Sequence, residues 1–202
     1  MEFNDILHDL GTRLSKKRLH HTEGVADTAK KLAERYGADP DAAELAGWIH
    51  DCVKQEKLSF MQELVRGKEM FSPGYKVDSY MMQSKNLLHG PAGAIFADAY
   101  YGIHDPAILS AVTCHTTGKP GMSLLDKIVF LADYIEPTRD FPGVNDIRHE
   151  AEKNLDWACI VAYDSTIAHL AEEHEYLHPL TVEGRNDLVS AWEKAHTETD
   201  EE

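Results

Sequence analysis

The sequence contains no apolar run long enough to cross a bilayer. A membrane-spanning helix needs about 20 predominantly apolar residues. The most apolar stretch, residues 124–135, is interrupted by Asp126, Lys127 and Asp133. The N-terminal segment MEFNDILHDLG is acidic and lacks the basic start and apolar centre of a secretory signal peptide. We therefore expect a cytoplasmic protein without a membrane partner.

Cysteines are few and widely spaced. Cys52, Cys114 and Cys159 form no C-x-x-C pair, so the sequence gives no indication of a zinc ribbon. Because their number is odd and the expected compartment is reducing, we predict three free, buried thiols.

Basic residues are outnumbered by acidic ones. The 20 Lys and Arg against 35 Asp and Glu give a formal net charge of −15. A chain without a basic surplus has little with which to neutralise the phosphates of DNA or RNA, so we expect no nucleic-acid partner. A small phosphate-containing ligand remains compatible with this charge, because metal ions and a few local cations can accept it.

The sequence predicts a single all-α domain over residues 1–202. Apolar residues recur at helical spacing, and no alternating pattern is long enough for a sheet. Gly37 is typical of a helix end, and Asp39-Pro40 is typical of the next helix start. The expected helices cover about residues 3–14, 21–35, 40–55, 57–66, 90–101, 105–116, 122–136, 144–155, 157–175 and 183–196. Residues 67–85 are expected to form a loop, and residues 195–202 a frayed tail.

Histidine is the unusual component, with 12 copies. Six histidines and aspartates from five segments, each on or beside a predicted helix, are candidates for a metal site, because bundle-core sites are assembled in this way. They are His21, His50, Asp51, His89, His115 and Asp133. The adjacent His50 and Asp51 diverge by about 100° on a helix and can serve two metals or bridge them. Imidazole and carboxylate donors suit iron, manganese or zinc.

Spacing alone leaves other interpretations open. His115 can be a hydrogen-bonded core histidine, and Asp133 can pair with Lys127 or Arg139. A His-Asp dipeptide also occurs by chance. Composition and periodicity therefore support a metal site without deciding for it.

The order of these residues resembles the H…HD…H…H…D pattern of the HD-domain superfamily. The segments LLHGPAGA (87–94), CHTTGKPGMSLLDKIVFLADYIEPTRDFPGV (114–144) and PLT…GRNDL (179–188) resemble the bacterial YqeK-type family. That family consists of HD-domain hydrolases that split diadenosine tetraphosphate symmetrically into two ADP. The resemblance runs from about Arg18 to Leu188, and about residues 18–137 carry the ligand motifs. It implies a single HD-domain helical bundle with the metal site between helices.

The resemblance also implies roles for individual residues. His21, His50, Asp51 and Asp133 match the ligands of one metal; His89 and His115 match those of a second, with Asp51 bridging both. Iron is the usual metal of the family. Two such metals lower the pKa of a shared water and supply hydroxide near neutral pH. The resemblance places phosphate-contacting residues at Lys54, Thr116, Thr117, Arg139 and Arg185.

Several alternatives accompany this interpretation. Lys54 can instead be a solvated lysine at a helix end, and the segment of Arg185 can simply dock the last helix. Phe71, Tyr75 and Tyr80 of the loop can stack on an adenine or pack in the core or a dimer interface. The chain can hydrolyse another nucleotide, such as a nucleoside monophosphate, a cyclic dinucleotide or an alarmone, or can be a non-catalytic metal or nucleotide sensor. A homodimer is a further expectation.

Overall fold

The computed structural model describes residues 1–197, which form an all-helical fold without a strand among them. This confirms the predicted all-α class. The helices are α1 (Phe3–Arg13), α2 (Lys16–Tyr36), α3 (Pro40–Ile49), α4 (Leu58–Val65), α5 (Lys85–Phe96), α6 (Pro106–Cys114), α7 (Leu124–Ile135), α8 (Val144–Ala151), α9 (Leu155–Glu172) and α10 (Pro179–Thr197). A 3-10 helix (Met81–Gln83) precedes α5, and a π-helical turn (Ala97–Tyr101) follows it.

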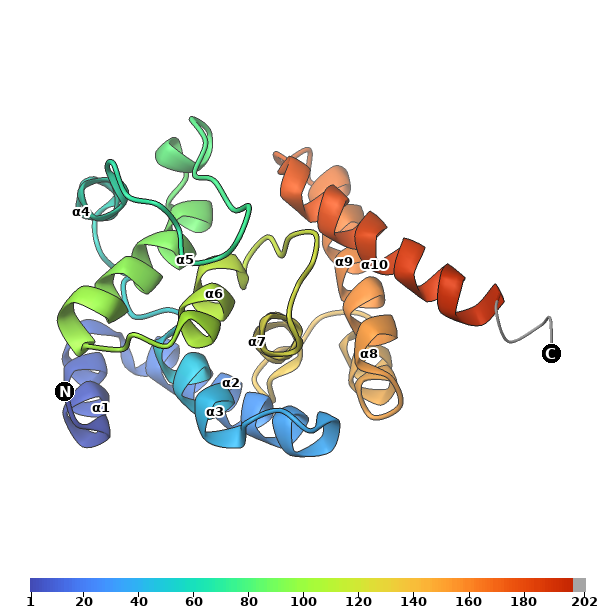
Figure 1. Cartoon of the computed structure of the whole chain (residues 1–202), viewed down its shortest axis with the longest axis horizontal. Coiled ribbons are helices and arrows are strands. Elements are labelled where there is room, and N and C mark those ends of the chain that lie inside the picture. Colours follow the sequence, from blue (N-terminus) through green and yellow to red (C-terminus); the bar gives the residue numbers. More distant parts are fainter. Residues whose placement is uncertain (198–202) are drawn as a thin grey trace.

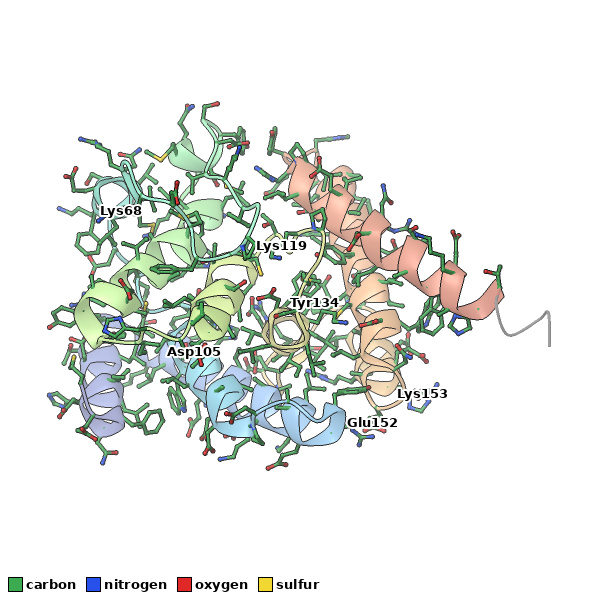
Figure 2. The ribbon with its side chains drawn as sticks, in the orientation of Figure 1. Lys68, Asp105, Lys119, Tyr134, Glu152 and Lys153 are labelled. Carbon is green, nitrogen blue, oxygen red and sulfur yellow. The ribbon has the colours of Figure 1, made fainter. Side chains whose placement is uncertain are left out.

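The helices form two groups that meet at α7 (Figure 1). On one side α2 packs on α3 and α7, and α5 packs on α4 and α6. On the other side α9 packs on α8, α10 and α7. Lys119 and Tyr134 lie near the boundary between the groups, whereas Lys68 and Lys153 lie far from it on opposite sides (Figure 2). The connections around α7 therefore lie where segments from both groups come together.

The contact between α2 and α3 is unusually close. A Cβ added to Gly47 would lie 2.6 Å from Cα of Ala26, so only glycine fits at this crossing. Ala43 and Ala46 on the same face of α3 are fully buried. This close packing brings the C-terminal end of α3 against α2, where two of the candidate ligands lie.

Several predicted helix boundaries are wrong. Helix α2 begins at Lys16 rather than at 21, because Ser15 caps it by accepting a hydrogen bond from the Arg18 amide. Helix α3 ends at Ile49 rather than at 55, and tighter turns follow in which the amides of Cys52 and Lys54 bond three residues back. Helix α5 begins at Lys85 rather than at 90 and includes Pro91 within it.

The last helix is longer than predicted, since α10 begins at Pro179 and continues to Thr197. The tail expected to fray from residue 195 is therefore helical up to 197, and residues 198–202 lie outside the described part. The three cysteines are free and buried, as predicted. Among residues 1–197 no helix is long and apolar enough to cross a membrane.

Candidate metal centre

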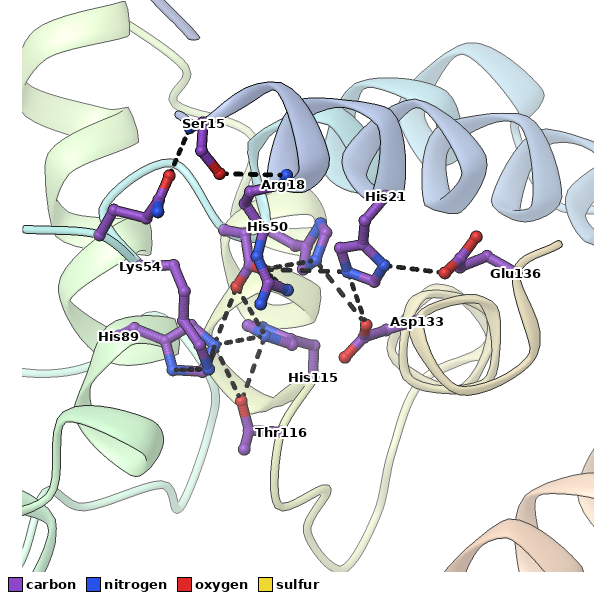
Figure 3. Close-up of polar contacts among 12 residues, drawn as sticks. Ser15, Arg18, His21, His50, Lys54, His89, His115, Thr116, Asp133 and Glu136 are labelled. Atoms are coloured by element: carbon purple, nitrogen blue, oxygen red, sulfur yellow. Dashed lines mark hydrogen bonds and ion pairs between the residues drawn. The ribbon is translucent and has the colours of Figure 1, made fainter. Parts of the chain in front are cut away.

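Six histidine and aspartate side chains from five segments converge in the interior beside α7 (Figure 3). On α2 and α5 the candidate ligand lies within the helix. In the other three segments it lies near or just after a helix end. Those on helices are His21 on α2, His89 on α5 and Asp133 on α7; those just after helices are His50 and Asp51 after α3 and His115 after α6. The structure thus brings together all six residues that the sequence singled out.

Donor atoms fall into two overlapping groups. One consists of His21, His50 and Asp133, and the other of His50, Asp51 and His115; within each group the donors lie within 4.8 Å of one another. His21 Nε2 lies 3.1 Å from Asp133 Oδ1. Separations of this size are compatible with several donors sharing one cation.

Asp51 lies between the two sets of imidazoles. Its Oδ2 is 3.4 Å from His50 Nε2 and 3.9 Å from His21 Nε2. Its Oδ1 is 3.1 Å from His89 Nε2 and 3.9 Å from His115 Nε2. Each carboxylate oxygen therefore faces a different pair of histidines, which is the arrangement that a bridging ligand needs.

The histidine rings are oriented by hydrogen bonds at their far nitrogens. Nδ1 of His50 donates to the Gly47 carbonyl at 2.6 Å, and Nδ1 of His115 donates to the Val112 carbonyl at 2.8 Å. A carbonyl only accepts, so these bonds place the proton on Nδ1 and leave the Nε2 lone pair facing the cluster. A fixed tautomer of this kind is typical of metal-binding histidines.

Two of these inward nitrogens are buried without a hydrogen-bond partner, namely Nε2 of His21 and Nε2 of His50. An unpartnered polar atom in the interior costs free energy, on the order of 1–3 kcal/mol. A metal ion removes this cost, because it accepts the lone pairs that no protein donor takes. The residues present therefore fit a metal bound through nitrogen and oxygen.

Charge is stabilised on both carboxylates of the cluster. Burial opposes ionisation of Asp51, but His50 and His89 outweigh it and hold its pKa well below the usual range. Burial likewise opposes ionisation of Asp133, and His21 and Arg139 reverse the effect, so that its pKa is also low. Both aspartates are therefore anionic at neutral pH, as ligands must be.

The histidines respond differently to the same environment. Burial together with His89 and His50 lowers the pKa of His115 to about 3, so this ring is neutral. Burial and Lys54 also lower the pKa of His89. For His50, burial is outweighed by Asp51 and Asp133, which raise its pKa.

Three basic side chains border the cluster. Arg18 Nη1 lies 2.9 Å from Asp51 Oδ2, and the Arg139 guanidinium binds both the side chain and the carbonyl of Asp133. Lys54 Nζ lies 3.3 Å from His89 Nδ1, and burial lowers the pKa of this lysine. The structure thus places Lys54 and Arg139 beside the cluster, and their contact with phosphate stays a prediction.

The three other residues predicted to contact phosphate differ in their position relative to the cluster. Thr116 Oγ1 lies 3.1 Å from His115 Nε2 and 3.3 Å from His89 Nε2. The hydroxyl of the buried Thr117 instead bonds to Tyr75 and to the Gly118 carbonyl. Arg185 is paired with Asp164 of α9 at 2.8 Å and is not brought to the cluster.

Two neighbours were not predicted from the sequence. Arg18 reaches Asp51 from 33 positions away, and Glu136 accepts a hydrogen bond from His21 Nδ1 across 115 positions. Helical spacing contained a signal for Arg18, which lies three residues before His21 on one helix face. The role of Glu136 depends on a tertiary contact that no local pattern indicates.

Comparison with known proteins finds one matching family and several relatives of similar length. A model of the HD domain family matches residues 18–138. A protein of Halalkalibacterium halodurans named symmetrical bis(5'-nucleosyl)-tetraphosphatase is 41% identical over 87% of this chain and 91% of its own length. A Bacillus subtilis protein of the same name is 39% identical over 88% of this chain and 92% of its own length.

A solved structure has the same fold. The crystal structure of a Clostridium acetobutylicum protein, described as a predicted HD superfamily hydrolase involved in NAD metabolism, matches with a TM-score of 0.87. It is 39% identical in sequence, and the match covers 95% of this chain and 98% of that one.

Proposed function

Because this chain belongs to the HD domain family and, within it, to the family of the symmetrical bis(5'-nucleosyl)-tetraphosphatases, we propose that it hydrolyses diadenosine tetraphosphate to two ADP. The observation that carries the proposal is Asp51, whose two oxygens face two different pairs of histidines. A carboxylate so placed serves a pair of metal ions, and paired metals are suited to phosphoryl chemistry.

The proposed ligands form two sets that share Asp51. One metal would be held by His21, His50, Asp51 and Asp133, and the other by His89, His115 and Asp51. We propose iron as the metal; manganese and zinc suit the same nitrogen and oxygen donors.

Bound metals would supply a water of lowered pKa and polarise the phosphoryl group. Water adds to one of the two central phosphorus atoms, and the bond from that phosphorus to the central bridging oxygen breaks. The bridging oxygen leaves on the other half of the substrate, so that both products are ADP. Cleavage at the central bridging oxygen, rather than at an outer one, decides this outcome.

The side chains around the ligands hold the tetraphosphate. Arg18, Lys54 and Arg139 neutralise its oxygens, and the Arg139 fork can bind two of them at once. Thr116 can donate its hydroxyl to a phosphoryl oxygen, because this atom lies next to both His89 and His115. A local group of cations thus offsets the net charge of −15. A homodimer stays a prediction of the sequence.

A comparison of turnover rates distinguishes diadenosine tetraphosphate from other possible substrates. The purified, metal-loaded protein is incubated with diadenosine tetraphosphate, NAD, a nucleoside monophosphate, a cyclic dinucleotide and an alarmone. We expect the highest kcat/KM for diadenosine tetraphosphate. Faster hydrolysis of another member of the panel would contradict the substrate assignment, and no turnover of any member would favour a sensor.

The bridging role of Asp51 is tested by metal content. Elemental analysis should find two metal ions per chain in the wild type and fewer in Asp51→Ala. Asp164→Ala is the matched control, because this aspartate on α9 pairs with Arg185 away from the cluster and should leave two ions bound. Two ions in Asp51→Ala would show that the carboxylate does not bridge.

A further inference from the structure

A cleft of about 530 Å³ opens beside the metal centre, on the side of His89 and His115. Its walls include Tyr80 before α5, Leu87 on α5, Thr166 and Leu170 on α9, and Tyr176 between α9 and α10. The volume lies in the range of small-molecule sites, about 300–1,000 Å³. The cleft is large enough for a ligand group beyond the phosphates.

Thr116 joins this cleft to the metal centre. It lines the cleft, and its hydroxyl lies within 3.3 Å of the Nε2 atoms of His89 and His115. A substrate whose phosphates lie against the proposed metal ligands therefore has its next group at the entrance of the cleft.

The charge of the walls separates this cleft from its neighbour. A second cleft of about 490 Å³, on the side of His21, is lined by three basic residues, Lys17, Arg18 and Arg139, and by two acidic ones, Glu136 and Asp140. Of the described residues that line the first cleft, none is lysine or arginine, and one is the acidic Glu175. The first cleft thus suits a neutral group, and the second suits anionic phosphates.

Two exposed tyrosines stack at the edge of the first cleft. The ring centroids of Tyr80 and Tyr176 are 3.4 Å apart with planes inclined by 17°, although the two residues are 39% and 44% exposed. His178 bonds to Asp78 at 3.1 Å and holds their two segments together. Nearby, Tyr75 is buried in the core, so of the loop tyrosines it is Tyr80 that offers a ring surface at the cleft.

We propose that this cleft binds one nucleoside of the substrate, with the base stacked on the Tyr80–Tyr176 pair. The inference rests on the proposed function, since it takes a nucleoside attached to the phosphates at the metal centre. A purine presents a flat π-face that stacks on tyrosine, and such stacking does not require charge. The ribose would lie between the base and Thr116.

The test compares two ligands that share their phosphates and differ in the nucleoside. ADP and inorganic pyrophosphate are used as competitive inhibitors of the metal-loaded enzyme. In Tyr176→Ala we expect the inhibition constant of ADP to rise about tenfold, because a base–aromatic stack is lost. The constant for pyrophosphate should stay within about twofold of the wild type. An unchanged constant for ADP, or an equal rise for both ligands, would overturn the proposal.

Two further variants serve as a control and as an independent test of the cleft. Tyr100→Ala is the matched control, because Tyr100 is also exposed but stacks on Phe96 away from the cleft, and it should leave both constants unchanged. Thr166→Trp fills the cleft from α9 and should weaken ADP without weakening pyrophosphate. If it weakens neither, the nucleoside does not lie in this cleft.

Failure of the proposed function gives a different result. If the wild type does not hydrolyse diadenosine tetraphosphate, the same ADP and pyrophosphate comparison is made by calorimetry on the metal-loaded protein. Tighter binding of ADP than of pyrophosphate, lost in Tyr176→Ala, would support the nucleoside cleft even then. Equal binding of the two ligands to the wild type would overturn it.

Discussion

Glu136, at the C-terminal end of α7, accepts a hydrogen bond from Nδ1 of His21 on α2 at 2.9 Å. The Glu136 side chain is fully buried, and Thr138 donates to it through both its amide and its hydroxyl. Burial opposes ionisation of Glu136, but the bonds from Thr138 and His21 lower its pKa. The carboxylate thus fixes the His21 ring with Nε2 directed at Asp133, which gives Glu136 a role in metal binding without being a ligand.

Gly24 makes room for this carboxylate. A Cβ at position 24 would lie 2.6 Å from Glu136 Oε2, so in Gly24→Ala the Glu136 carboxylate must shift from its place beside His21. We expect metal affinity, measured by competition with a chelator, to fall about 10- to 100-fold, as it does when comparable supporting contacts are removed.

The matched control for this substitution is Gly11→Ala. Gly11 also lies within a helix, but a Cβ there meets nothing within 4 Å. This variant should keep full metal affinity and gain up to about 1 kcal/mol of stability from the better helix former. Wild-type metal affinity in Gly24→Ala would contradict the positioning role of Glu136.

Arginine at position 139 should not be replaceable by lysine. The Arg139 guanidinium binds the carbonyl of Asp133 through Nε at 2.8 Å and its carboxylate through Nη2. Lysine keeps the charge but cannot make two bonds from one planar group. We expect Arg139→Lys to bind two metals and to lose about 10- to 100-fold in kcat/KM, the effect of losing one hydrogen bond to a charged group.

Arg66→Lys provides the comparison for this loss. Arg66 is exposed at the end of α4 and pairs with Glu63 at 3.4 Å, so its replacement should leave kcat/KM unchanged. Full activity in Arg139→Lys, measured on the same substrate, would show that catalysis does not need the two hydrogen bonds of the guanidinium.

The bond between Asp78 and His178 predicts a pH-dependent stability. Burial raises the pKa of Asp78, but the Met81 amide and His178 outweigh it and lower the pKa below the usual value. The stabilisation is therefore present above the unfolded pKa of about 3.9 and is lost as the pH falls through the lower folded pKa. Asp78→Asn keeps the turn bonds to Tyr80 and Met81 but puts an amide against His178.

Urea unfolding of the metal-free protein measures this effect. At pH 7 we expect Asp78→Asn to be less stable by up to about 1 kcal/mol, because the aspartate is largely exposed. The difference should persist to about pH 5 and shrink below about pH 4. Asp105→Asn, which keeps the single cap bond to the Ala107 amide, should match the wild type. A difference that grows on acidification would contradict the assignment.

The sequence predicted the helical class and the six converging residues, because both depend on patterns that it displays directly. Small residues at helical spacing before His50 indicated that this histidine points inward, and the close contact at Gly47 bears this out. The assignment of these residues to two metals came from the resemblance to a family, because spacing alone left open whether they bind metal.

The sequence did not predict the contacts that depend on tertiary distance. Nothing local connects Glu136 with His21, or Tyr80 with Tyr176, since the pairs meet only when α7 packs on α2 and α9 turns back beside the loop. The end of α3 was misplaced for a related reason. Its helical pattern continues past Ile49, but the chain tightens into turns there and directs His50, Asp51 and Lys54 toward the other ligands.

Identification of the products tests the central claim most directly. The metal-loaded protein is incubated with diadenosine tetraphosphate, and the nucleotides are separated by chromatography over a time course. The account predicts two ADP for each substrate consumed, and no reaction after a chelator has removed the metals. AMP together with ATP as the main products would contradict it, because an outer bridging bond would then have broken instead of the central one.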